Sequence, residues 1–450
     1  MAKLLLKKDL LQVFIAMTRF LSGLVAALIS LSAVAEQNRI DTIRHDAPEL
    51  AYFGEHTVGV RTLRLSNPGQ VDVLNSTAAA GAVLSTRRLT VEVWYPAVLG
   101  SDQQSGGQYE TTTRNLAVTA TLHGRAVRNA EADNTLKRMP LVIISHGYPG
   151  NRYLMSHLAE NLASKGYVVA AIDHADSTYE DQATIWSTLY HRPQDQLFVV
   201  NEISLLSKSK DSFLMQIVDT DRVGIVGYSM GGYGLLVNMG AGYTDMTADF
   251  AEDLPATVAK RNAASNLGSE STADTRIKAG IAIAPCCMNR GMWNQEALGR
   301  ITTPVMFMAG SIDETAGYAN GVRAVFDATV NSDRYLLTFQ NAGHNAIAPI
   351  PLPVEIHESE DQAGAFHYTD AVWDSTRSSN IMFHFTTAFL DYHLKGDASR
   401  LSYLELVENS QEGIWSVEDG APTDEHSYWQ GFPQFSARGL VLEHQPPAGQ

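Results

Sequence analysis

The chain has 450 residues, and 49 acidic against 33 basic side chains give it a formal net charge of −16. This charge argues against a nucleic-acid-binding surface and against electrostatic docking on anionic lipid, because both partners are themselves negatively charged. The expected partner is therefore a small or neutral molecule.

The first 35 residues differ in composition from the rest of the chain. Four basic residues precede an apolar run at 20–32, and small residues follow at 33–35. A basic segment, a short apolar segment and small residues in this order predict a secretory signal peptide, cleaved after about Ala35. The apolar run is shorter than the roughly 20 residues that span a bilayer. We therefore expect a secreted or periplasmic protein with no stable membrane insertion after cleavage.

Two segments that follow alternate apolar and polar residues, namely 57–67 and 88–98. A period of two predicts antiparallel strands with one face in water. Residues 97–138 are then polar and rich in Gly, Ser, Thr and Asn, which predicts a surface excursion.

From Pro140 onward, short apolar runs alternate with helical patterns. The predicted buried strands are 140–147, 167–174, 222–229, 277–285, 303–311 and 334–340. The predicted helices are 152–166, 192–206 with Pro193 near its start, one from Gly231, 291–298, 317–330 and 377–396. Strands buried on both faces and separated by helices predict a mostly parallel, doubly wound α/β sheet.

This organisation predicts a single domain over 36–450, with its core at about 58–395. Residues 241–276 are rich in Asp, Ala, Thr and Asn and interrupt the alternation, so we expect a small cap there. Residues 397–450 have no clear period and are expected to form a C-terminal extension.

The motif Gly227-Tyr228-Ser229-Met230-Gly231 follows a predicted strand and precedes a predicted helix. A G-x-S-x-G turn at such a place exposes the serine as a nucleophile. An acid and a histidine should then follow further strand ends in the order Ser, Asp, His. Asp313 and His344 do so, which predicts that His344 takes the proton of Ser229 while Asp313 orients the imidazole.

A tetrahedral intermediate also needs donors for its oxyanion. One should be the backbone N–H of Met230, beside the nucleophile. The other should come from the loop after the first buried parallel strand, where we expect the N–H of Tyr148. The side chains of Tyr148 and Tyr228 are candidates for the wall of a substrate pocket.

Other residues compete for these roles. Glu314 is a rival acid beside Asp313, whereas Asp327 and Asp333 fall in a predicted helix and before a strand. His174 also follows a strand but precedes the serine, so we interpret it as an orienting or structural residue.

The only two cysteines, Cys286 and Cys287, are neighbours. Adjacent cysteines cannot close a useful loop, so two buried thiols are favoured over a strained disulfide. The sequence has no H-E-x-x-H, C-x-x-C or Walker motif, and we therefore predict neither a metal nor any other cofactor.

With these motifs in place, the chain resembles the α/β-hydrolases, and within them the bacterial relatives of platelet-activating-factor acetylhydrolase that are described as predicted dienelactone hydrolases. The resemblance rests on "VEVWYPA", "PLVIISHGYPGNRYLMSHLAENLASKGYVVAAIDHADST", "GIVGYSMGGYG", "PVMFMAGSIDET" and "NAGHN". It implies a catalytic triad of Ser229, Asp313 and His344, with oxyanion donors at Tyr148 and Met230. The dienelactone hydrolases proper have a cysteine in place of Ser229.

The sequence thus predicts a serine hydrolase that cleaves carboxylic esters through an acyl-enzyme. Short-acyl esters and phospholipid- or polyester-like esters are the expected substrates, and the oligomeric state is open. A catalytically silent binding protein of the same fold and an amidase or peptidase are the alternatives, because fold alone does not determine function.

Overall fold

The computed structural model describes residues 37–266, 273–360 and 362–449. The predicted signal peptide and residues 267–272 of the predicted cap lie outside these ranges. Asn38–Gln450 forms one compact unit. Among the described residues, no helix is both long enough and apolar enough to cross a membrane.

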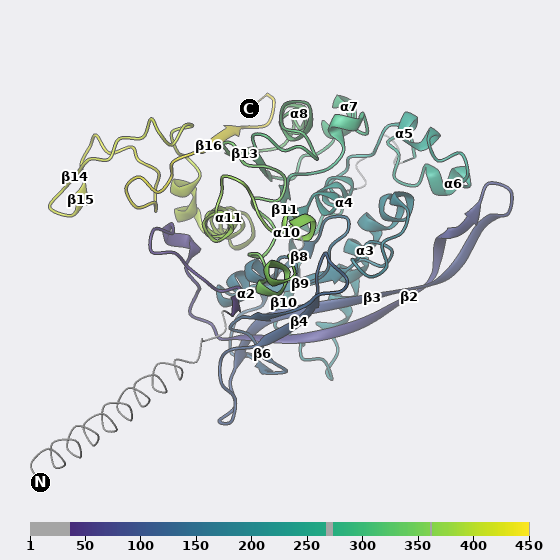
Figure 1. The fold of residues 1–450 in the computed structure, drawn as a ribbon, viewed down its shortest axis with the longest axis horizontal. Coiled ribbons are helices and arrows are strands. Elements are labelled where there is room, and N and C mark those ends of the chain that lie inside the picture. The colour runs from purple at the N-terminus through teal and green to yellow at the C-terminus, as the bar shows by residue number, and fades with distance from the viewer. Residues whose placement is uncertain (1–36, 267–272, 361, 450) are drawn as a thin grey trace, which may run out of the picture. The chain divides into compact units, whose positions relative to one another are not determined.

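The main sheet of the described residues has 11 strands, in the order β16-β13-β12-β11-β10-β8-β9-β3-β2-β6, with β7 paired to β3 (Figure 1). Its strands are β2 (Val58–Thr77), β3 (Gly81–Val98), β6 (Val127–Arg128), β7 (Glu131–Ala132), β8 (Met139–Ser145), β9 (Val168–Asp173), β10 (Val218–Tyr228), β11 (Ile277–Ile283), β12 (Val305–Gly310), β13 (Arg334–Phe339) and β16 (Leu440–Gln445). β8 to β13 run parallel, whereas β2, β3 and β16 join as antiparallel strands. The predicted sheet type and the six predicted parallel strands are confirmed.

The order of the parallel strands reverses between β8 and β10. The chain passes from β8 to its neighbour β9 on one side and then returns to β10 on the other side of β8. Loops that leave such a switch point diverge to opposite faces of the sheet, which opens a crevice at the carboxyl ends of the strands. Ser229 follows β10 and Tyr148 follows β8, so both lie at this point.

Helices cover both faces of the sheet, because alternate strand residues point to opposite sides. In β8, Val142 and Ile144 belong to one apolar cluster, which includes residues of α2 and α11. Leu141 and Ile143 belong to the other, which includes residues of α3, α4, α7 and α8. These helices are α2 (Ser156–Ser164), α3 (Ile185–Leu206), α4 (Met230–Asn238), α7 (Gln295–Leu298), α8 (Arg323–Ala328) and α11 (Ser375–Leu390).

Pro193 lies inside α3 and not near its start, so the prediction for this helix is wrong. Proline lacks an N–H and leaves the carbonyl four residues earlier without its helical donor. In this helix that carbonyl belongs to Leu189, and it accepts hydrogen bonds from Tyr233 Oη and Asn262 Nδ2, both at 2.7 Å. Tertiary donors therefore replace the missing bond, and the helix continues.

Two segments that were expected to be irregular contribute strands. Within 97–138, β4 (Gln108–Thr112) and β5 (Thr119–His123) form a small sheet with β1 (Asn38–Arg39), and Tyr109 and Leu122 enter the core. In the C-terminal extension, β16 pairs with β13 and extends the main sheet. Both segments lacked a clear signal because their strands are short and lie among mostly polar residues.

The predicted cap contains two short helices, α5 (Asp245–Asp249) and α6 (Ala256–Ala259). The hairpin of β2 and β3 extends toward them beyond the strands with which it pairs (Figure 1). At its tip, Ala78 N–H donates to the Asp253 carbonyl at 2.8 Å. The remaining elements are η1 (Glu49–Ala51), η2 (Met288–Arg290), η3 (Tyr318–Val322), α9 (Val354–Glu358), α10 (Gln362–Ala365), η4 (Asp391–Lys395), η5 (Ala398–Tyr403), β14 (Val417–Glu418) and β15 (Ala421–Pro422).

Candidate active site

Ser229 occupies a sharp turn between β10 and α4. Its φ of 52° and ψ of −110° fall in a region that non-glycine residues rarely adopt. Such strain persists where the surroundings enforce it, and it is frequent at functional sites. The turn separates the serine from both the strand and the helix.

Both glycines of the motif are required by close packing. A Cβ on Gly227 would lie 2.3 Å from the Gly231 carbonyl oxygen, and one on Gly231 would lie 1.9 Å from the Ser145 carbonyl oxygen. Neither position can hold a side chain unless the backbone moves. The sequence motif thus reflects a tight turn packed against the end of β8.

The structure brings Ser229, His344 and Asp313 into one hydrogen-bonded chain. His344 Nε2 lies 3.2 Å from Ser229 Oγ, and His344 Nδ1 lies 2.8 Å from Asp313 Oδ2. His344 and Asp313 come from the loops after β13 and β12. This arrangement allows the imidazole to accept the serine proton while the carboxylate holds the opposite ring nitrogen.

Asp313 is held in its charged form. Burial alone would raise the pKa of this carboxyl, but His344 and the backbone N–H groups of Thr315 and Ala316 outweigh burial and lower the pKa below its ordinary value. The two N–H groups donate to Asp313 Oδ1 at 2.8 and 2.7 Å. The second carboxylate oxygen is therefore free to orient His344.

The predicted oxyanion donors lie on two sides of Ser229. Met230 is the first residue of α4, where a backbone N–H has no helical acceptor. A Cβ on Gly147, the neighbour of Tyr148, would lie 3.5 Å from Ser229 Cβ, so the loop after β8 packs directly against Ser229. The Tyr148 side chain is half-buried, and its hydroxyl donates to the Ala183 carbonyl.

Tyr228 is buried and supports the histidine loop. Its ring centroid lies 5.2 Å from that of His344, and its hydroxyl donates to Asn345 Oδ1 at 2.7 Å. Next to this loop, His367 Nε2 lies 2.6 Å from Tyr179 Oη. Asn345 and His367 did not emerge from the sequence, because no motif distinguishes a supporting polar residue.

The rival acids have other partners. Glu314 accepts a hydrogen bond from the His344 backbone N–H at 3.3 Å, whereas the imidazole ring contacts Asp313. Asp327 pairs with Arg323 on α8, and Asp333 contacts His444 Nε2 at 2.7 Å.

Cys286 and Cys287 form a disulfide, so the expectation of two buried thiols is wrong. The left-handed backbone of Cys287, with φ of 92°, accompanies this link between neighbours. The pair borders Ser229, because Cys286 N–H donates to the Ser229 carbonyl at 3.2 Å and Cys287 Sγ lies 3.9 Å from Met230 Sδ.

A second chain of serine, histidine and aspartate lies behind the loop that follows β8. Ser145 Oγ is 2.9 Å from His174 Nε2, and His174 Nδ1 is 3.0 Å from Asp195 Oδ2. Arg87 donates to both oxygens of Asp195 at 2.7 and 2.9 Å. The expected orienting or structural role of His174 agrees with its complete burial.

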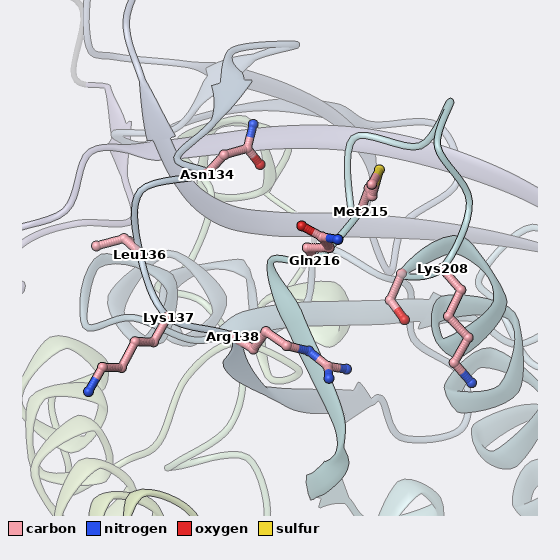
Figure 2. A pocket seen from close by; sticks show the side chains of 8 residues that line it. Asn134, Leu136, Lys137, Arg138, Lys208, Met215 and Gln216 are labelled. Atoms are coloured by element: carbon pink, nitrogen blue, oxygen red, sulfur yellow. The ribbon is translucent and has the colours of Figure 1, made fainter.

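A cavity of about 670 Å³ lies at the amino-terminal ends of β8 and β10, opposite the strand ends that carry Ser229 (Figure 2). Figure 2 shows the side chains that line it. Some, including Lys137 and Arg138, belong to the segment before β8, and the others, including Lys208 and Met215, belong to the segment before β10. Ser229 follows the carboxyl end of β10, so this cavity does not belong to the site.

Comparisons with known proteins find one matching family model and similar solved structures. A family model described as "PETase: PET hydrolase-like" matches residues 99–248, or 150 of 450 residues. This range includes Tyr148 and Ser229. Among solved structures, the chain is similar to a ferulic acid esterase from Streptomyces cinnamoneus, with 19% identity and a TM-score of 0.49 over 81% of this chain and 96% of that chain. No curated protein matches.

The family match extends over the loop after β8 and the turn that holds Ser229. The sheet has the strand order in which a G-x-S-x-G turn normally occurs. It does not support the narrower resemblance to platelet-activating-factor acetylhydrolases or dienelactone hydrolases. The chain therefore has the α/β-hydrolase fold.

Proposed function

We propose that this protein is a serine hydrolase of carboxylic esters. The observation that carries the proposal is the hydrogen-bonded chain from Ser229 through His344 to Asp313, on a strained turn at the switch point of the sheet. The match to a PET hydrolase-like family model also supports ester chemistry.

In the proposed reaction, Ser229 Oγ attacks the ester carbonyl carbon while His344 Nε2 accepts the hydroxyl proton. The carbonyl oxygen becomes an oxyanion between the N–H groups of Met230 and Tyr148. His344 then protonates the departing alkoxide, which leaves as the alcohol, and the acyl group remains on Ser229. Water attacks this acyl-enzyme with the same histidine as base, releases the acid and restores the serine.

Exposed apolar side chains near the triad favour an apolar ester. Ile312, which precedes Asp313, is 58% exposed, and Phe366, whose carbonyl accepts a hydrogen bond from Asn345 Nδ2, is 70% exposed. Large exposed apolar side chains around a site are typical of surfaces that bind apolar ligands. We therefore favour a polyester-like or other apolar ester over a highly charged one.

The test uses the chain from residue 36 onward with p-nitrophenyl esters from acetate to dodecanoate and with an amorphous aromatic polyester film. We expect hydrolysis of the soluble esters, release of acid from the film, and labelling of Ser229 by a reactive phosphonate. Ser229→Ala is the matched control and should abolish all three. A folded protein that hydrolyses none of these esters and resists the phosphonate would refute the proposal.

A further inference from the structure

Arg192, on α3, is buried directly behind the loop that follows β8. It is only 1% exposed, although arginine is rarely buried without a charged partner. One terminal nitrogen donates to the His146 carbonyl, and the other donates to the Gly147 carbonyl at 3.1 Å and to Ser177 Oγ. The guanidinium thus binds two successive carbonyl groups, which its planar fork of donors can do and a single ammonium cannot.

The Gly147 carbonyl and the Tyr148 N–H belong to the same peptide unit. In a planar trans peptide these two groups point in opposite directions. A donor that holds the carbonyl on one side of the loop therefore aims the N–H to the other side. Arg192 lies on one side of this loop, and Gly147 packs against Ser229.

His146 fixes the same carbonyl. His146 Nδ1 lies 2.7 Å from the Gly147 oxygen, and His146 Nε2 accepts the His174 backbone N–H at 3.3 Å. The ring proton therefore resides on Nδ1, which donates to the carbonyl. Burial, together with the charge of Arg192, lowers the pKa of His146 well below its ordinary value, so the ring stays neutral.

The charge of Arg192 is also placed to act on the loop. Among the described residues, the oxygen atoms that its guanidinium contacts are all neutral, namely those of Ser145, His146, Gly147 and Ser177. Burial lowers the pKa of Arg192 to about 9, although the Asp195 carboxylate, which does not bind the guanidinium directly, acts to raise it. A fixed positive charge near a developing oxyanion stabilises it in a medium of low dielectric constant.

We propose that Arg192 is a positioning residue of the oxyanion hole, which holds the carbonyls of His146 and Gly147 so that the Tyr148 N–H faces the oxyanion. This inference rests on the proposed esterase function. It predicts an effect on the transition state that exceeds any effect on substrate binding.

The test compares Arg192→Lys with Arg334→Lys as a matched control. Arg334 is also buried and donates to carbonyl groups, with Nε 2.9 Å from the Phe326 oxygen, but it begins β13 at the edge of the sheet away from Ser229. With p-nitrophenyl butyrate, Arg192→Lys should lower kcat by about 100-fold, as loss of one oxyanion donor does, and leave KM within about twofold. Arg334→Lys should leave both constants near the wild-type values.

Phosphonylation of Ser229 provides a second readout, because the phosphoryl oxygen enters the same hole. Its rate should fall in Arg192→Lys by a factor similar to that for kcat, in protein that circular dichroism shows to be folded. Equal kcat values for the two variants, or a loss confined to KM, would overturn the role of Arg192. If the wild-type protein neither hydrolyses esters nor reacts with the phosphonate, the esterase proposal fails, and this inference fails with it. Should Arg192→Lys not fold, Ser177→Ala removes one anchor of the guanidinium and should lower kcat by a smaller factor at unchanged KM.

Discussion

The two chains of serine, histidine and aspartate in this molecule have nearly the same geometry. In Ser229–His344–Asp313 the two contacts measure 3.2 and 2.8 Å, and in Ser145–His174–Asp195 they measure 2.9 and 3.0 Å. In both, Nε2 faces the serine and Nδ1 faces the carboxylate. Hydrogen-bond geometry alone would not identify the nucleophile.

The backbone and the access to solvent separate the two serines. Ser145 ends a regular strand and is completely buried, whereas Ser229 occupies a strained turn with two candidate oxyanion donors beside it. Ser229 is 9% exposed and Ser145 is 0% exposed, so of these two serines only Ser229 is open to solvent. A serine nucleophile requires an accessible position and hydrogen-bond donors for the developing oxyanion, in addition to a base.

Electrostatics suit His174 to a structural role. Burial and the charge of Arg192 lower the pKa of His174 to about 3, so this ring resists protonation. A general base must accept a proton in the transition state. His174 is therefore suited to fix neighbouring groups as a neutral hydrogen-bonding ring.

The largest expected difference concerns the two serines. Ser229→Ala should lower kcat by about 10⁴-fold or more, because the nucleophile is lost. Ser145→Ala should keep kcat within about tenfold but destabilise the fold by about 1–3 kcal/mol, since the buried His174 Nε2 loses its donor. Steady-state kinetics and urea denaturation of both variants test this. A catalytic loss of equal size in Ser145→Ala would contradict the distinction.

Substitution of Asp313 should affect mainly catalysis, whereas substitution of Asp195 should affect mainly stability. Asp313→Asn should lower kcat by about 10⁴-fold, because an amide cannot hold the imidazole in the required tautomer. Asp195→Asn should instead cost about 3–5 kcal/mol of stability, because it leaves the buried Arg87 without its principal charge partner. Kinetics at saturating substrate and the midpoint of urea denaturation measure the two effects. The reverse pattern would assign catalysis to Ser145, His174 and Asp195 and a structural role to Ser229, His344 and Asp313.

The buried His174 should make the free energy of unfolding decrease at acidic pH. The unfolded pKa is near 6.5 and the folded pKa is about 3, so between these values the unfolded chain binds one more proton and the free energy of unfolding falls as pH falls. His174→Asn retains an amide donor for Asp195 but does not titrate. This substitution should reduce the slope of the free energy of unfolding against pH by up to about 1.4 kcal/mol per pH unit within this window. Urea denaturation at pH 7, 5.5 and 4.5 provides the measurement, and parallel profiles for variant and wild type would rule out this contribution.

The smallest effect is expected at the disulfide beside Ser229. Replacing Cys286 and Cys287 together with alanine retains the backbone bond from residue 286 to the Ser229 carbonyl. We therefore expect kcat/KM to change by less than about threefold, or under 1 kcal/mol. The p-nitrophenyl ester assay measures the change, and a larger loss in a folded variant would assign the disulfide a role in the site.

Local sequence patterns predicted the parallel sheet and the proposed catalytic residues. Apolar runs marked the six parallel strands, and the glycines around Ser229 marked a turn that admits no side chain at Gly227 or Gly231. The order of Ser229, Asp313 and His344 then followed from strand ends. Each strand pattern and each motif lies within a few consecutive residues, so a single sequence reveals it.

Which polar residues support the site, and where the irregular segments join the fold, depends on contacts between residues far apart in the chain. Arg192 and His146 are 46 positions apart, and the paired residues of β13 and β16 are 101 to 111 positions apart. Pro193 remains within a helix because Tyr233 and Asn262 supply the missing donors. Contacts between distant segments arise from burial and hydrogen-bond satisfaction in three dimensions, which no local period encodes.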